Sequence, residues 1–308
     1  MSNKKSVLII GGLGYIGSSL TKYLAARDYP VTVLDNQFFH QAINTPPNVE
    51  VIIDDCLNYE YYNCFNTVIN LAAYVGAPLC NKIAESAVTE LNTEFVSSLT
   101  KVMGSDQLLI FPNTNSSYGS SGESLCTEES PMNPLSRYAQ TKDKAEKYVT
   151  DSGGIAFRLA TVFGSSPRMR WDLLVNTFCF EAYYKKRLEI FDPHYRRNFV
   201  AVNDVCRAFE FAIENQDNMR GQAFNLGMDE CNMTKGELAQ KVCNHFKAEY
   251  VVGIGVDPDK RDYRVSSAKL ARLGFRATTS IDTGLMLMEK YLDGKLFNSK
   301  DLKTMRNV

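Results

Sequence analysis

Histidine, tryptophan and paired cysteines are scarce in this chain of 308 residues. It has three histidines (His40, His194 and His245), one tryptophan and no C-x-x-C spacing among its eight cysteines. Without Cys or His pairs at ligand spacing, no metal site is expected. Most cysteines lie inside apolar runs, which is typical of reduced, buried thiols; they are Cys56, Cys64, Cys80, Cys126, Cys179, Cys206, Cys231 and Cys243.

The sequence also lacks an excess of charge and a long apolar run. Lys and Arg number 34 against 35 Asp and Glu, so no overall field favours nucleic acid or an anionic membrane. Any anion site must come from local arginines. No stretch approaches the ~20 apolar residues that span a bilayer. The N-terminal run "VLIIGGLGYIG" is short and broken by glycines, which argues against a signal peptide, so we expect a soluble, cytoplasmic protein.

Short β-branched runs alternate with helical patterns in the first half of the chain. This rhythm predicts an α/β fold, a doubly wound parallel (Rossmann) sheet with helices on both faces. The expected strands are Val7–Gly11, Val31–Asp35, Val49–Asp54, Thr67–Ala73, Gln107–Pro112 and Ile155–Val162, and the expected helices are Tyr15–Arg27, Ile83–Met103 and Leu135–Thr150.

The rhythm changes after Phe163, where shorter elements follow. We expect helices at Trp171–Lys186 and Lys235–Phe246 and another around Leu285–Leu292. The predicted organisation is a nucleotide-binding domain over residues 1–163, to which residues 197–224 return. A second, smaller α/β lobe over 164–308, mainly 164–196 and 225–308, would bind the substrate across a cleft.

A glycine-rich loop follows the first expected strand and opens the first helix. Gly11, Gly14 and Gly17 form G-x-x-G-x-x-G, which lets the backbone approach a pyrophosphate whose charge lies at the helix N-terminus. Asp35 ends the second strand, where a carboxylate binds a ribose 2′-hydroxyl and repels a 2′-phosphate. No Arg or Lys lies between Asn36 and Val49, so NAD is favoured over NADP. The predicted cofactor contacts are Gly11, Gly14, Tyr15, Ile16, Gly17, Asp35, Asn36, Asp55, Cys56, Leu71, Ala72 and Ala73.

Two reactive side chains share one helix face. Tyr138 and Lys142 are four residues apart, in the expected helix that follows "FPNTNSSYG", where an apolar strand runs into hydroxyls and amides. A free tyrosine has a pKa near ~10, and a neighbouring ammonium and a positive nicotinamide ring would both stabilise its phenolate. Lowering that pKa by about three units takes ~4 kcal/mol, within reach of two cations. Alone, Y-x-x-x-K is a common surface pair; its place behind a nucleotide loop favours catalysis.

Together these motifs resemble a known family. The glycine loop, Asp35, "NLAA", Thr114 four residues before "YG", and Y-x-x-x-K resemble the extended short-chain dehydrogenases/reductases, specifically the NAD-dependent sugar-nucleotide epimerases and dehydratases. The resemblance covers nearly the whole chain. The signatures "PNTNSSYG", "FRLATVFGSSPRMRWDLLVN" and "DPDKRDY" are similar to a narrower branch that oxidises C4 of GDP-linked heptoses for bacterial surface polysaccharides.

The resemblance implies roles for individual residues. Tyr138 takes the proton of the sugar 4-hydroxyl while C4 passes its hydride to NAD. Lys142 holds the cofactor ribose, and Thr114 hydrogen-bonds the reacting oxygen. A homodimer through a four-helix bundle is also implied, from the helices near Ile83–Met103 and Leu135–Thr150. The implied substrate contacts are Arg197 and Arg261 on the diphosphate, with Val75, Asn115, Ser116, Thr161, Arg168 and Arg170.

Departures from the family pattern narrow the reaction. Dehydratases of the family carry Asp-Glu after the Ser/Thr, whereas this chain has Asn115 and Ser116, so a 4,6-dehydratase is disfavoured. Ile10 replaces a usual Thr, and Thr161 replaces an asparagine that often contacts phosphate. A 4-dehydrogenase, which we favour slightly, and a 4-epimerase both stay open. The rivals are a non-catalytic NAD sensor and an NADPH-dependent reductase, which Asp35 opposes.

Overall fold

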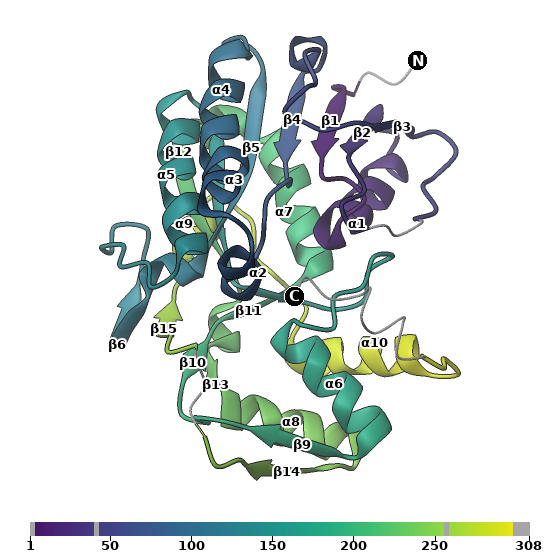
Figure 1. Ribbon diagram of the computed structural model, residues 1–308, viewed down its shortest axis with the longest axis vertical. Helices are drawn as coiled ribbons and strands as arrows, with labels where there is room; N and C mark the ends of the chain where they lie inside the picture. Colours follow the sequence, from purple (N-terminus) through teal and green to yellow (C-terminus); the bar gives the residue numbers. More distant parts are fainter. Residues whose placement is uncertain (1–3, 40–42, 256–258, 298–308) are drawn as a thin grey trace.

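The computed structural model describes residues 4–39, 43–255 and 259–297. His40 and the last part of the predicted C-terminal lobe, residues 298–308, lie outside these ranges. A parallel sheet of seven strands forms the centre, in the order β3-β2-β1-β4-β5-β7-β12 (Figure 1). The order reverses direction between β1 and β4, so the predicted doubly wound fold is confirmed. The strands are β1 (Val7–Ile10), β2 (Val31–Asp35), β3 (Glu50–Ile53), β4 (Thr67–Asn70), β5 (Leu108–Thr114), β7 (Ile155–Leu159) and β12 (Gln222–Leu226).

Helices cover both faces of the sheet, because the central strands β1 and β4 are buried at every position. Side chains of a strand alternate between the two faces. Val7 and Ile9 of β1 therefore join one core with α1 (Tyr15–Ala25) and α7 (Val202–Glu214). Leu8 and Ile10 face the opposite way and join a second core with α4 (Phe95–Val102) and α5 (Arg137–Asp151).

The predicted long helix Ile83–Met103 differs in detail. A short helix α2 (Ala77–Lys82) comes first, and Ile83 directly after it has an extended backbone. Helical structure resumes with α3 (Glu85–Thr89) and passes through a π-helical turn (Glu90–Glu94) into α4. The π turn buries Asn92 and Thr93 against α5: the hydroxyl of Thr93 donates to the carbonyl of Thr141 at 3.1 Å. Such turns are frequent at functional sites.

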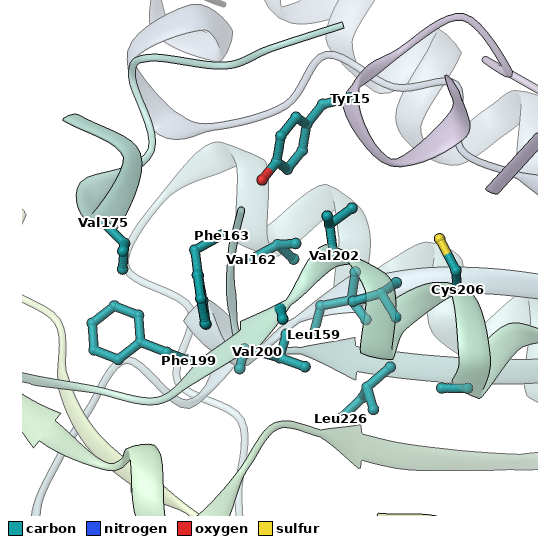
Figure 2. Packing of buried hydrophobic residues seen from close by; sticks show 14 of the residues in the cluster. Tyr15, Leu159, Val162, Phe163, Val175, Phe199, Val200, Val202, Cys206 and Leu226 are labelled. Carbon is teal, nitrogen blue, oxygen red and sulfur yellow. The ribbon is translucent and has the colours of Figure 1, made fainter. Parts of the chain in front are cut away.

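Three predicted strand ends differ from the structure by more than one residue. β4 stops at Asn70, and β5 continues to Thr114. The predicted strand Ile155–Val162 breaks at Ala160, whose N–H donates to the carbonyl of Leu226. The next N–H, that of Thr161, donates to the backbone carbonyl of Asn198. β8 (Thr161–Phe163) therefore leaves the sheet and pairs with β11 (Phe199–Ala201). Figure 2 shows the apolar packing around this junction, where Phe163 and Phe199 lie near Val175 and Val202.

The smaller C-terminal lobe lies beneath the sheet in Figure 1, below the carboxyl ends of its strands. The predicted helix Lys235–Phe246 is confirmed, whereas two other helices begin at different residues than expected, at Leu174 and Ile281. The boundary at residue 163 stays a prediction. The remaining elements are α6 (Leu174–Lys185), β9 (Arg187–Ile190), β10 (Arg196–Arg197), β13 (Met233–Thr234), α8 (Lys235–Phe246), β14 (Glu249–Val252), β6 (Ser120–Cys126), β15 (Asp262–Val265), α9 (Ala268–Arg272) and α10 (Ile281–Leu292), with short 3-10 turns at Tyr62–Cys64, Asn115–Tyr118, Gln216–Asn218 and Asp229–Cys231.

The eight cysteines are all unpaired, and all but Cys64 are buried. Within residues 4–39, 43–255 and 259–297, no helix combines the length and apolar character that crossing a bilayer requires.

Candidate active site

A cavity of about 1140 Å³ lies at the carboxyl ends of the sheet strands, between the sheet and the C-terminal lobe. This is where ligands bind in doubly wound folds. The described residues of its wall include eight Lys or Arg side chains and four Asp side chains, although the whole chain has a net charge of −1. The wall therefore attracts anions locally. All predicted site residues line the cavity except Asp55 and Asn115.

The glycine loop leaves the N-terminus of α1 open toward the cavity. Gly11 has a φ of 77°, and a Cβ on it would lie 2.8 Å from the backbone nitrogen of Ala72. A Cβ on Gly17 would lie 2.2 Å from the carbonyl oxygen of Gly11. Only glycine permits this close packing, and α1 has no acidic residue in its first turn. The cradle fits the pyrophosphate of a dinucleotide.

Asp35 closes the loop from the end of β2. Its carboxylate accepts backbone N–H groups from Leu13 at 2.9 Å and Gln37 at 2.8 Å. Burial raises the pKa of Asp35, and the two backbone donors offset part of that rise. The carboxylate thus lies where a dinucleotide would place its adenosine ribose.

The adenosine end differs from the prediction by one residue. Cys56 lines the cavity as expected, but Asp54 lines it in place of Asp55. Asp55 instead accepts a hydrogen bond from the side-chain amide of Asn36 at 3.1 Å. Asp55 therefore does not line the cavity itself, but its hydrogen bond positions the side chain of Asn36, which does.

Arg168 lies at this adenosine end, and not among the substrate contacts that the resemblance implied. It is 2 % exposed, its N–H donates to the hydroxyl of Ser18 in α1, and its guanidinium lies 4.3 Å from the ring centroid of Phe39. Burial lowers the pKa of Arg168 to about 10, and Asp35 partly offsets that effect. Among the described residues, its Nη2 has no hydrogen-bond partner. No local spacing in the sequence signals this placement.

Arg168 leads to a prediction about cofactor choice. Replacing Asp35 removes the group that repels a 2′-phosphate, while Arg168 remains beside it as a positive partner. We expect Asp35→Ser to lower the Kd for NADP relative to that for NAD by tenfold or more, measured by titration of cofactor binding. The double variant Asp35→Ser/Arg168→Met should lose that gain. An unchanged Kd ratio in the single variant would contradict the placement.

Tyr138 and Lys142 lie one helical turn apart in α5, and both line the cavity. Burial raises the pKa of Tyr138 to about 12, although Arg170 and Arg261 act to lower it. Lys142 is 2 % exposed, and its Nζ lies 3.7 Å from the ring centroid of Phe111. Burial lowers the pKa of Lys142 to about 7. The protein alone therefore does not make Tyr138 a base at neutral pH.

A buried polar network holds α5 against the end of β5. The side-chain amide of Asn113 donates to Asp143 at 3.0 Å and to Glu146 at 2.6 Å. Glu146 in turn forms an ion pair with Arg158 of β7, at 2.7 Å. Buried charges of this kind are stable only when they are paired. The network fixes the helix that carries Tyr138 relative to the strand that carries Thr114.

Thr114 ends β5 and caps the following 3-10 turn. Its hydroxyl accepts the N–H of Ser116 at 3.1 Å and donates to the hydroxyl of Ser116 at 2.9 Å. Arg261 also donates to the hydroxyl of Ser116. Asn115 is fully buried and does not line the cavity, so its implied substrate contact stays a prediction. Neither the nitrogen nor the oxygen of its side-chain amide has a hydrogen-bond partner within the described part of the chain.

Two arginines from distant segments meet at the cavity wall. Arg197 donates to the carbonyl of Arg261, and Asp259 pairs with both guanidinium groups, at 3.0 Å from Arg197. The arginines hold the pKa of Asp259 well below its usual range. Sequence reasoning missed Asp259, whose position two residues before Arg261 was the available signal.

Arg170 is also paired, with Asp172. Val75 and Thr161 line the cavity as well. Among the described residues, no group of three or more His, Cys, Asp or Glu side chains is arranged to hold a metal ion.

The chain belongs to the NAD dependent epimerase/dehydratase family, whose model matches residues 7–227. It is 26% identical over 318 residues to UDP-glucuronic acid decarboxylase 1 of Danio rerio, covering 96% of this chain and 74% of the relative. Its structure is similar to that of the UDP-glucose 4-epimerase of Thermus thermophilus in complex with NAD, with a TM-score of 0.83 and 23% identity, covering 94% of this chain and 100% of that chain. It is also similar to that of the UDP-glucose 4-epimerase of Thermotoga maritima with UDP-glucose, with a TM-score of 0.83 and 23% identity, covering 93% of this chain and 98% of that chain. The predicted family and the NAD cofactor agree with these findings.

Proposed function

We propose that the protein oxidises the C4 hydroxyl of a nucleotide-diphosphate sugar, with Tyr138 as the base. The observation that carries this proposal is that one cavity joins the glycine cradle, Tyr138 with Thr114, and the arginine pair Arg197 and Arg261. A bound NAD would supply the hydride acceptor. The arginine pair would hold the diphosphate and so place the sugar against Tyr138.

Thr114 and Tyr138 would orient the sugar hydroxyl and remove its proton. Thr114 would turn its hydroxyl from Ser116 to the sugar oxygen and so orient it. The phenolate of Tyr138 would take the proton. Its raised pKa means that the fields of Arg170 and Arg261, the ammonium of Lys142 and the positive nicotinamide ring must act together.

The wall carries no acid/base pair where a 4,6-dehydratase of the family has one. Asn115 and Ser116 follow Thr114, and neither titrates near neutral pH. The four carboxylates of the wall lie elsewhere. Asp35 and Asp54 belong to the adenosine end, and Asp172 and Asp259 are paired with arginines. We therefore propose oxidation without loss of water.

The ketone could then be released or reduced again from its other face. Release, a 4-dehydrogenase acting on a GDP-heptose or related GDP-sugar, follows from the three signature segments described above. The alternative, a 4-epimerase, has the support of the two similar structures, both of UDP-glucose 4-epimerases. Dimerisation through α4 and α5, a role in surface polysaccharide synthesis and a cytoplasmic location stay predictions.

One assay separates these fates. The purified protein is incubated with NAD and GDP-, UDP-, dTDP- or CDP-sugars in deuterated water, and the reduced cofactor and products are followed by absorbance and NMR. We expect a 4-keto sugar and an equal amount of reduced cofactor, with deuterium entering beside the ketone. A C4-inverted sugar without net reduced cofactor would instead establish the epimerase.

A further inference from the structure

The cavity wall contains a buried lysine that the proposed oxidation does not use. Lys235 is 4 % exposed and lines the cavity. It is the first residue of α8, where the helix dipole disfavours a cation, and burial adds a desolvation cost. Its Nζ donates to the carbonyl of Phe191. An ammonium has three donors, so it can serve this carbonyl and a ligand oxygen together.

The pairing of β10 with β13 places Lys235 beside Arg197. Arg197 lies opposite Met233 in this antiparallel pair, and the pairing continues where the N–H of Lys235 donates to the carbonyl of Tyr195 at 2.9 Å. Lys235 itself begins α8 directly beyond this ribbon, and both Lys235 and Arg197 line the cavity.

The contacts give an order of groups along the wall. Arg261 donates to Ser116, beside Thr114. Arg197 donates to the carbonyl of Arg261, and the N–H of Lys235 donates to the carbonyl of Tyr195, two residues before Arg197. If the reacting sugar lies at Thr114 and the diphosphate on the two arginines, the next part of the substrate is the nucleoside. Lys235 lies at that end.

We infer that Lys235 determines nucleotide specificity by donating a hydrogen bond to a keto oxygen of the substrate's base, an inference that rests on the proposed function. Guanine, uracil and thymine present a keto oxygen, whereas adenine and cytosine present an amino group at the matching position. An amino group would meet the ammonium donor to donor. A site built to hydrogen-bond a substrate group discriminates strongly against its absence. GDP should therefore bind better than ADP, and UDP better than CDP.

The test uses these two pairs of nearly isosteric ligands. Dissociation constants of GDP, ADP, UDP and CDP are measured by calorimetry for the full-length protein saturated with NAD, which occupies the glycine cradle and the adenosine end, with inorganic pyrophosphate as a ligand without a base. We expect each keto base to bind about tenfold tighter than its amino partner. Lys235→Met should bring both ratios close to one and leave the affinity for pyrophosphate unchanged.

Two further variants make the test robust. Lys235→Gln keeps the polarity and can both donate and accept, so it should bind all four nucleotides with little discrimination. Lys241→Met changes an exposed lysine of the same helix, paired with Asp282, and should keep the ratios of the unmodified protein. Equal losses for all ligands including pyrophosphate, or unchanged ratios in Lys235→Met and Lys235→Gln, would overturn the inference. If no nucleotide or pyrophosphate bound, the proposed function itself would fail and this inference with it.

Discussion

Tyr138→Phe should lower kcat by about 10³-fold while leaving NAD binding and thermal stability nearly unchanged. The substitution removes one hydroxyl, and the polar network that positions α5 does not include it. General base catalysis by a positioned side chain contributes about 10²–10⁴-fold, and phenylalanine cannot accept the proton. The measurement is single-turnover reduction of the cofactor with a competent nucleotide sugar, together with a cofactor titration.

Tyr148→Phe is the matched control, because Tyr148 is an exposed tyrosine of the same helix. It should turn over like the unmodified protein. Turnover that survives Tyr138→Phe would remove the base from the proposed reaction. If the unmodified protein bound NAD but reduced none with any nucleotide sugar, the non-catalytic sensor would be the better description.

Thr114→Ala offers a separate view of the same step. It removes the hydroxyl expected to orient the sugar oxygen, so kcat should fall by roughly 10²-fold with a smaller change in KM. Loss of the turn cap would add about 1 kcal/mol of instability, which Thr114→Ser should restore together with activity.

Local patterns made the fold and the reacting pair predictable. The glycine loop, Asp35 and the Tyr138 to Lys142 spacing each depend on one or two adjoining elements, so sequence spacing carries their geometry. Sequence spacing did not distinguish Asp54, which lines the cavity, from Asp55 beside it, because both follow the end of β3 in irregular backbone.

Long-range pairings were not predictable in the same way. Arg168 reaches the adenosine end because the loop after β8 crosses to α1, where its N–H meets Ser18. The carboxylate of Asp259 neutralises part of the charge of Arg197, from which it is separated by 62 positions of the chain. No spacing rule reports such contacts, since they follow from how the C-terminal lobe folds back on the sheet.

Lys142→Met should stabilise the cofactor-free protein near neutral pH while it lowers kcat by 10²-fold or more. The pKa of Lys142 falls from 10.5 to about 7 on folding. Between these pH values the unfolded chain holds a proton that the folded protein has released, so stability rises with pH across this window and the lysine costs stability below it. The difference of about 3.5 between these two pKa values corresponds to ~5 kcal/mol as an upper bound.

Methionine fills similar space without this cost, so we expect Tm at pH 7 to rise by about 2 °C or more and its dependence on pH between 7 and 10 to flatten. Lys144→Met, an exposed lysine on the same helix, should change neither quantity. A lower Tm for Lys142→Met would show that the contact with Phe111 outweighs desolvation. Without the ammonium of Lys142, the phenolate of Tyr138 would be less stable and the pKa of Tyr138 would be higher. The acid limb of the pH profile of the residual turnover should therefore move to higher pH. Lys142 would thus destabilise the empty site and yet be needed for turnover. The reaction explains this combination, because the charge of Lys142 is used only once cofactor and substrate are bound.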